Sequence, residues 1–143
     1  MIKFKVPAFK VGSGECNNHI LIDYIAKQNK PIILSTGMNN MSSVDQSVKI
    51  INKYHNKLAL LHCTNVYPSS FNSLRLNSIL ELKNKYKKNI VGYSDHSIGI
   101  YPSIIAMSLG ALIVEKHFVD HKKFKGPDII CSMDPSELKE LIK

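Results

Sequence analysis

Short apolar runs recur along this chain at a spacing of roughly 25 to 30 residues, and amphipathic stretches separate them. This alternation is typical of βα units, whose strands lie parallel in one sheet. The runs at residues 31–35 and 58–63 are almost wholly apolar. This is expected for strands that helices cover on one face and a packed interior covers on the other. The five expected strands are residues 9–12, 31–35, 58–63, 90–93 and 112–116.

The stretches between these runs carry patterns of helix ends. Ser43 and Gln46 form a capping-box pattern ahead of an apolar helix face. Pro102 suits the first turn of a helix that Gly110 can end. Asp134, followed by proline, predicts the N-terminal cap of a last helix. Five βα units are too few to close an eight-stranded barrel, so the pattern predicts an α/β fold that forms part of one.

Composition narrows the class of protein. With 143 residues and 44% hydrophobic content, the chain can bury one ordinary core. Its 3 cysteines lie far apart without CxxC spacing, which favours buried free thiols and a reducing compartment. We see no signal sequence and no run long enough to cross a membrane, so we expect a cytoplasmic protein without a membrane partner.

The net charge of +8 does not indicate a nucleic-acid partner. The lysines are scattered, and their densest cluster closes one amphipathic helix, where cations suit the helix dipole and the solvent. No aromatic residues alternate with them as a base-stacking surface requires. We therefore expect no nucleic-acid binding.

Polar residues follow each expected strand, at the point where it ends. In a (β/α)₈ barrel, the carboxyl ends of the strands form the active face. These strand ends should therefore meet in one site. In chain order they supply Lys10, Ser13, Ser35, Asn65, Ser94, His96, Glu115 and His117.

Alternation along the strands assigns these side chains to faces. Ser94 and His96 share one side of their strand, as do Glu115 and His117. The two imidazoles can therefore converge on one divalent metal, with Glu115 one layer beneath. The side chains expected on the opposite face are Asp95 and Lys116.

Lys10 interrupts an otherwise apolar strand. A lysine that points into a barrel must meet an anion or lose its charge. The sequence leaves open a phosphate or carboxylate partner, a Schiff base, and an outward orientation along the surface. Ser13 and Ser35, with nearby glycines, add hydroxyl and backbone N–H groups that can hold anionic oxygens.

The chain resembles the sialic acid synthase family, which condenses phosphoenolpyruvate with N-acetylmannosamine. The resemblance covers nearly the whole chain, with the matching segments in the family's order. These segments are FKVGSGE at 9–15, PIILSTGM at 31–38, HCTNVYP at 62–68, GYSDHS at 92–97, EKHF at 115–118 and GPDI at 126–129.

The resemblance implies a TIM barrel, followed by a small antifreeze-like domain, in a domain-swapped homodimer. Residues 1–143 would then be roughly the last five βα units, with the first three units and the C-terminal domain absent. A divalent ion, Mn²⁺ or Mg²⁺, would be held by the matching His96 and His117. The remaining roles would fall to Lys10, Ser13, Ser35, Asn65 and Ser94 at phosphoenolpyruvate, to Tyr67 and Asp128 at the amino-sugar, and to Glu115 (with Lys10) in catalysis.

The resemblance implies that the intact protein is an enzyme that forms N-acetylneuraminate and phosphate from phosphoenolpyruvate and N-acetylmannosamine. The metal would polarise the sugar aldehyde, and Glu115 would move a proton. A legionaminic or pseudaminic acid synthase is the first alternative. A metal hydrolase on the same barrel and an inactive truncated remnant are the others.

Overall fold

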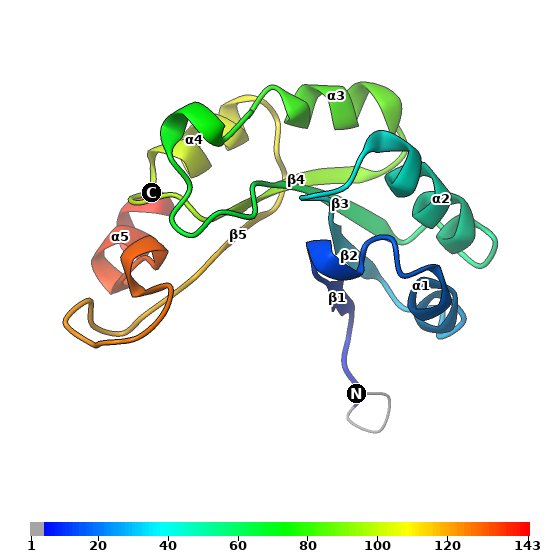
Figure 1. The fold of residues 1–143 in the computed structure, drawn as a ribbon, viewed down its shortest axis with the longest axis horizontal. Coiled ribbons are helices and arrows are strands. Elements are labelled where there is room, and N and C mark those ends of the chain that lie inside the picture. Colours follow the sequence, from blue (N-terminus) through cyan, green and yellow to red (C-terminus); the bar gives the residue numbers. More distant parts are fainter. Residues whose placement is uncertain (1–4) are drawn as a thin grey trace.

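A computed structural model describes residues 5–143, and within them five parallel strands form one sheet in the order of the chain (Figure 1). Each expected strand is present, with ends within two residues of the prediction. The strands are β1 (Phe9–Val11), β2 (Ile32–Ser35), β3 (Leu58–Cys63), β4 (Ile90–Asp95) and β5 (Val114–Lys116).

Helices follow the strands and cover the convex, outer face of the sheet (Figure 1). This βα order, with neighbouring strands parallel, confirms the predicted α/β fold as part of a TIM-type barrel. The helices are α1 (His19–Ala26), α2 (Met41–Asn52), α3 (Ser78–Lys85), α4 (Tyr101–Ser108) and α5 (Pro135–Leu141), with 3₁₀ turns at Ser13–Glu15, Phe71–Ser73 and Ile129–Cys131.

The start of α2 differs from the sequence prediction. Asn40 is the cap, and its side-chain oxygen accepts a hydrogen bond of 2.9 Å from the Ser43 backbone N–H. Ser43 and Gln46 both lie inside the helix, so their capping-box prediction is wrong. The predicted cap at Asp134 is confirmed, and it forms a capping box: its carboxylate accepts a hydrogen bond from the Glu137 N–H, and the Glu137 carboxylate accepts one from the Asp134 N–H.

The main core lies between the sheet and the outer helices. Strand side chains such as Leu34 and Leu60 pack there against Ile51 and Ile79, and all four are fully buried. Cysteines 16, 63 and 131 are free and buried, as the sequence predicts. Among the described residues, we find no helix with the length and apolarity needed to span a membrane.

Candidate functional site

The polar strand ends meet at the carboxyl edge of the sheet, on its concave face. The register places Ser94 beside Cys63 on one side and Glu115 on the other. Because side chains alternate, these groups face the interior, and the intervening residues face the helices. Asp95 and Lys116 indeed point to the helix side, as predicted.

Lys10 crosses the interior from β1 to β5. Its Nζ lies 3.3 Å from Glu115 Oε1 and donates a 3.0 Å hydrogen bond to Ser35 Oγ. The same Glu115 oxygen accepts a 2.8 Å hydrogen bond from Ser94 Oγ. Since β1 and β5 are the outer strands of the described sheet, this contact shows that the sheet curls around its interior. Lys10 therefore points inward and meets an anion.

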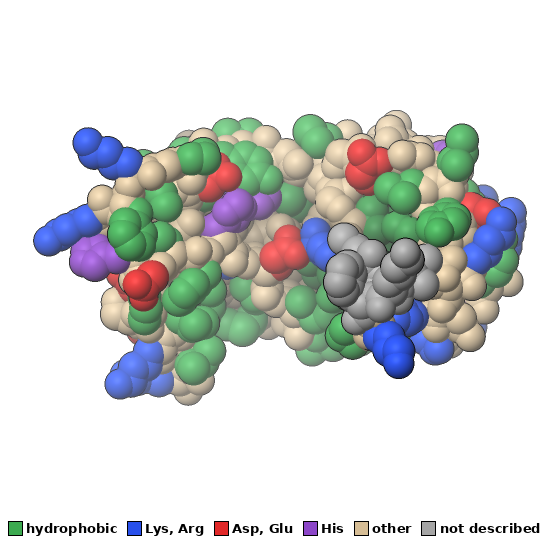
Figure 2. Space-filling model, turned by 90° about the horizontal axis from the view of Figure 1, so that it is seen from below, with side chains coloured by type: hydrophobic (Ala, Val, Ile, Leu, Met, Phe, Trp, Pro, Cys, Tyr) green, Lys and Arg blue, Asp and Glu red, His purple; other side chains and the backbone are tan. Residues whose placement is uncertain are grey.

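The concave face is visible from below in Figure 2. Acidic and basic side chains lie next to each other near the middle of this face, and histidine side chains lie close to them (Figure 2). The Lys10 and Glu115 side chains are only partly buried, with exposed fractions of 35% and 41%. A small polar ligand can therefore reach both groups from the open side.

A second polar group lies at the ends of β1 and β2. The Gly37 N–H donates a 3.0 Å hydrogen bond to Ser13 Oγ, and Asn39 donates one of 2.8 Å to the Ser13 carbonyl. A methyl group on Gly37 would collide with the Asn65 side-chain oxygen and lie 2.8 Å from the Cys63 carbonyl. The absence of a side chain at position 37, just after β2, therefore leaves room for Ser13 from the end of β1 and Asn65 from the end of β3.

His96 is held by Cys63 at the end of β3 and by Thr64, the residue that follows it. Its Nδ1 lies 2.9 Å from the Thr64 carbonyl, and the Cys63 thiol lies 3.8 Å from the same nitrogen. Burial lowers the pKa of His96 and raises the pKa of the Cys63 thiol. A neutral imidazole that donates from Nδ1 to Thr64 leaves a lone pair on Nε2, which is the form that ligates metals.

The second predicted ligand, His117, lies beside His96, with 5.4 Å between the ring centroids. The Tyr67 ring packs against both histidines, at 4.0 Å from His96 and 5.7 Å from His117. The structure thus brings three of the predicted site residues into one aromatic cluster. A small open hollow of about 240 Å³ adjoins it and is lined by Ser94, His96, Glu115, Lys116 and His117.

Part of a donor set for a divalent ion lines this hollow. His96 and His117 offer two imidazoles, and Glu115 lines the same hollow but is engaged by Lys10 and Ser94. Within the described residues, no group of three or more His, Cys, Asp or Glu side chains is arranged so that it could hold a metal ion by itself. Imidazole is a common ligand of zinc, copper, iron and nickel, and carboxylate of magnesium, calcium and manganese, so these side chains do not select one metal.

In the part of the chain that the structure describes, Asp128 forms its hydrogen bonds with Cys131 and Ser132, and not with the histidines or Tyr67. It adopts a left-handed conformation (φ 63°) at the start of a 3₁₀ turn, where its carbonyl accepts from Ser132 Oγ and Cys131 Sγ. Among residues 5–143, its hydrogen bonds are all within this turn. Its predicted contact with an amino-sugar stays a prediction.

Sequence reasoning missed the Thr64 carbonyl and the network around Asp95. A backbone carbonyl leaves no trace in residue type, so only the strand register could have identified Thr64. His62 on β3 lies away from the two histidines of the site: it stacks on Tyr93, and its Nε2 lies 2.7 Å from the Leu74 carbonyl.

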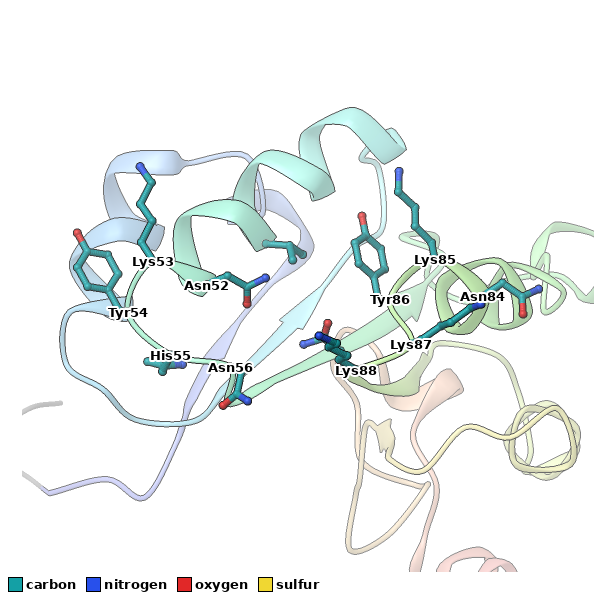
Figure 3. A pocket seen from close by; sticks show the side chains of 12 residues that line it. Asn52, Lys53, Tyr54, His55, Asn56, Asn84, Lys85, Tyr86, Lys87 and Lys88 are labelled. Carbon is teal, nitrogen blue, oxygen red and sulfur yellow. The ribbon is translucent and has the colours of Figure 1, made fainter.

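A larger hollow, of about 760 Å³, lies at the opposite end of the sheet (Figure 3). It is formed by the loops that precede β3 and β4, where Lys87 and Lys88 follow α3. The lysine cluster predicted at this helix end is present, and one member, Lys85, is paired with Asp45 at 2.6 Å. None of the predicted site residues lines this hollow, so volume alone does not identify the site.

Comparison with known proteins connects this arrangement to sugar-acid synthases. A family model described as the NeuB family matches residues 1–143. The N,N'-diacetyllegionaminic acid synthase of Campylobacter jejuni is 45% identical over 136 residues, which cover 93% of this chain and 40% of that protein. The human N-acetylneuraminate-9-phosphate synthase is 36% identical over 141 residues, covering 99% of this chain and 39% of that protein.

A solved structure gives the same result for the fold. The N-acetylneuraminic acid synthetase of Leptospira borgpetersenii, in complex with citrate, superposes with a TM-score of 0.95 and 34% identity. The match covers 99% of this chain and 49% of that one. This chain thus spans about two fifths of the length of the curated relatives above.

Proposed function

Because the chain belongs to the NeuB family, we propose that it forms part of a synthase that condenses phosphoenolpyruvate with an N-acetylated amino-sugar. N-acetylmannosamine is the proposed sugar, and N-acetylneuraminate and phosphate are the products. The observation that carries this proposal is the group formed by Lys10, Ser35, Ser94 and Glu115 beside the two histidines.

Lys10 is the proposed anchor for phosphoenolpyruvate, with Ser13, Ser35 and Asn65 around it. Its ammonium is already held by Ser35 and Glu115, so it faces the interior before any ligand arrives. An anionic substrate would then meet a charge that needs little reorganisation. Serine hydroxyls can donate further hydrogen bonds to carboxylate and phosphate oxygens.

The bond-forming step joins the enol carbon of phosphoenolpyruvate to the sugar aldehyde carbon. A divalent ion on His96 and His117 would supply Lewis acidity toward the aldehyde oxygen. Water then adds at the carbon that bears phosphate, and phosphate leaves by cleavage of its C–O bond. Glu115, which accepts a hydrogen bond from Ser94, would take the proton released by that water.

Tyr67 is proposed to hold the sugar, because its ring lies against both histidines and its side chain is exposed. The named relatives include legionaminic and pseudaminic acid synthases, and one of the former is 45% identical. A related amino-sugar is therefore the second candidate substrate.

Phosphate release from phosphoenolpyruvate tests the proposal. The polypeptide expressed from the whole reading frame is assayed with Mn²⁺ and either N-acetylmannosamine or the amino-sugar precursors of legionaminic and pseudaminic acids. We expect release only when a sugar is present, and the fastest sugar identifies the substrate. Phosphate release that ignores every sugar, or no release with any of them, would contradict the proposal.

A further inference from the structure

A buried ion pair lies directly behind the two histidines, on the helix face of the sheet. The Lys116 Nζ is 3.1 Å from Asp95 Oδ2, and both side chains are fully buried, with 0% exposure. Asp95 precedes His96 in the sequence, and Lys116 precedes His117. The pair is also the last register pair between β4 and β5.

The neighbouring groups satisfy the Asp95 carboxylate. Oδ1 accepts 2.8 Å and 2.6 Å hydrogen bonds from the N–H and hydroxyl of Ser97, and Oδ2 accepts one of 2.6 Å from Ser103 on α4. Lys116 donates a 2.7 Å hydrogen bond to the Ser97 carbonyl. Ser97 is thus held through three groups, immediately after His96.

Stability alone does not explain this arrangement. Burying two charges carries a desolvation cost that their attraction offsets only in part, so packed apolar residues would serve folding as well. The ion pair joins the ends of β4 and β5. Past this pair, the regular hydrogen bonding between the two strands stops. His96 and His117 each follow a member of this pair directly, and their ring centroids lie 5.4 Å apart.

From this placement we propose that Asp95 and Lys116 are positioning residues, which hold His96 and His117 at the spacing that a divalent cation requires. Both charged groups are fully buried against each other, although Lys116 lines part of the hollow beside the histidines. Neither charge is therefore proposed to touch the ion or the substrate. This inference rests on the proposed function, in which His96 and His117 are the metal ligands. It further holds that the affinity of these ligands for the metal depends on the two buried charges on the helix side of the sheet.

Mn²⁺ binding, followed by electron paramagnetic resonance well below the unfolding temperature, provides the test. The variants are Lys116→Met, Asp95→Asn and the double variant, which leaves no unpaired buried charge and so keeps the test valid if a single variant fails to fold. Lys27→Met is the matched control, because it removes an exposed ion pair with Asp23 (2.6 Å). His117→Ala tests the proposed metal site itself.

We expect the dissociation constant for Mn²⁺ to rise roughly 10- to 100-fold in the double variant, the range found for residues that orient metal ligands. Lys27→Met should bind as the parent chain does, and His117→Ala should lose binding. A folded double variant with parental affinity, alongside a His117→Ala variant that has lost it, would overturn this inference and leave the proposed function standing. Parental binding by His117→Ala would overturn the metal site, and this inference with it.

Discussion

Gly92 in β4 offers a sharp test of how tightly the curled sheet is packed. A methyl group added there would lie 2.5 Å from the Ile113 carbonyl oxygen and 2.6 Å from Leu61 Cδ2. That carbonyl accepts the 2.8 Å hydrogen bond from the Tyr93 N–H that leads into the β4–β5 pairing, so it cannot move away freely. Overpacking a core costs about 1–3 kcal/mol. Because the added methyl meets backbone, which gives way less easily than a side chain, we expect Gly92→Ala to lower the unfolding free energy by about 2–3 kcal/mol.

For a chain of 143 residues, an unfolding entropy of about 0.3 kcal/mol/K converts this cost into a melting temperature lower by roughly 7–10 °C. Gly12→Ala is the matched control, because nothing lies within 4 Å of the added methyl and the backbone there has φ −70°. Both changes restrict the unfolded chain alike, so their difference isolates the clash. Thermal denaturation followed by circular dichroism measures it, and equal melting temperatures would refute the packing argument.

Three further predictions concern single side chains. Burial lowers the pKa of His62 below its ordinary 6.5, so the unfolding free energy should fall as the pH drops from 7.5 to 5. Denaturant titration should show that the unfolding free energy of His62→Gln depends less on pH than that of the parent chain. An equal pH dependence in the two proteins would contradict this prediction. Asp134→Ala removes the cap of α5 and should cost about 0.5–2 kcal/mol in the same titration. Lys10→Met should weaken phosphoenolpyruvate binding in calorimetry at least tenfold, for a loss of about 1.4 kcal/mol or more, whereas Lys27→Met should not.

The strands and the faces of their side chains could be predicted because period and register leave a direct pattern in the sequence. The inward direction of Ser94 and Glu115, and the outward direction of Asp95 and Lys116, follow from alternation alone. That the outward residues form a buried ion pair could not be predicted. It depends on which residues of β4 and β5 stand opposite each other, and register between strands is a tertiary property.

The predicted start of α2 is wrong because two residues near it can both cap a helix. Asn40 and Ser43 are both good capping residues, and the structure selects Asn40, which begins α2 earlier. The packing of Tyr67 against both histidines depends on the path of a loop after β3, which no periodic pattern describes. The position of Asp128 relative to the site depends in the same way on a turn in a left-handed conformation.

The most direct test of the account compares phosphate release by the parent polypeptide and by His117→Ala, each with phosphoenolpyruvate, N-acetylmannosamine and Mn²⁺. The account predicts that the parent releases phosphate only when both sugar and metal are present, and that His117→Ala releases none above background. Near-parental, metal-dependent release by His117→Ala would contradict the assignment of the two histidines as the metal pair.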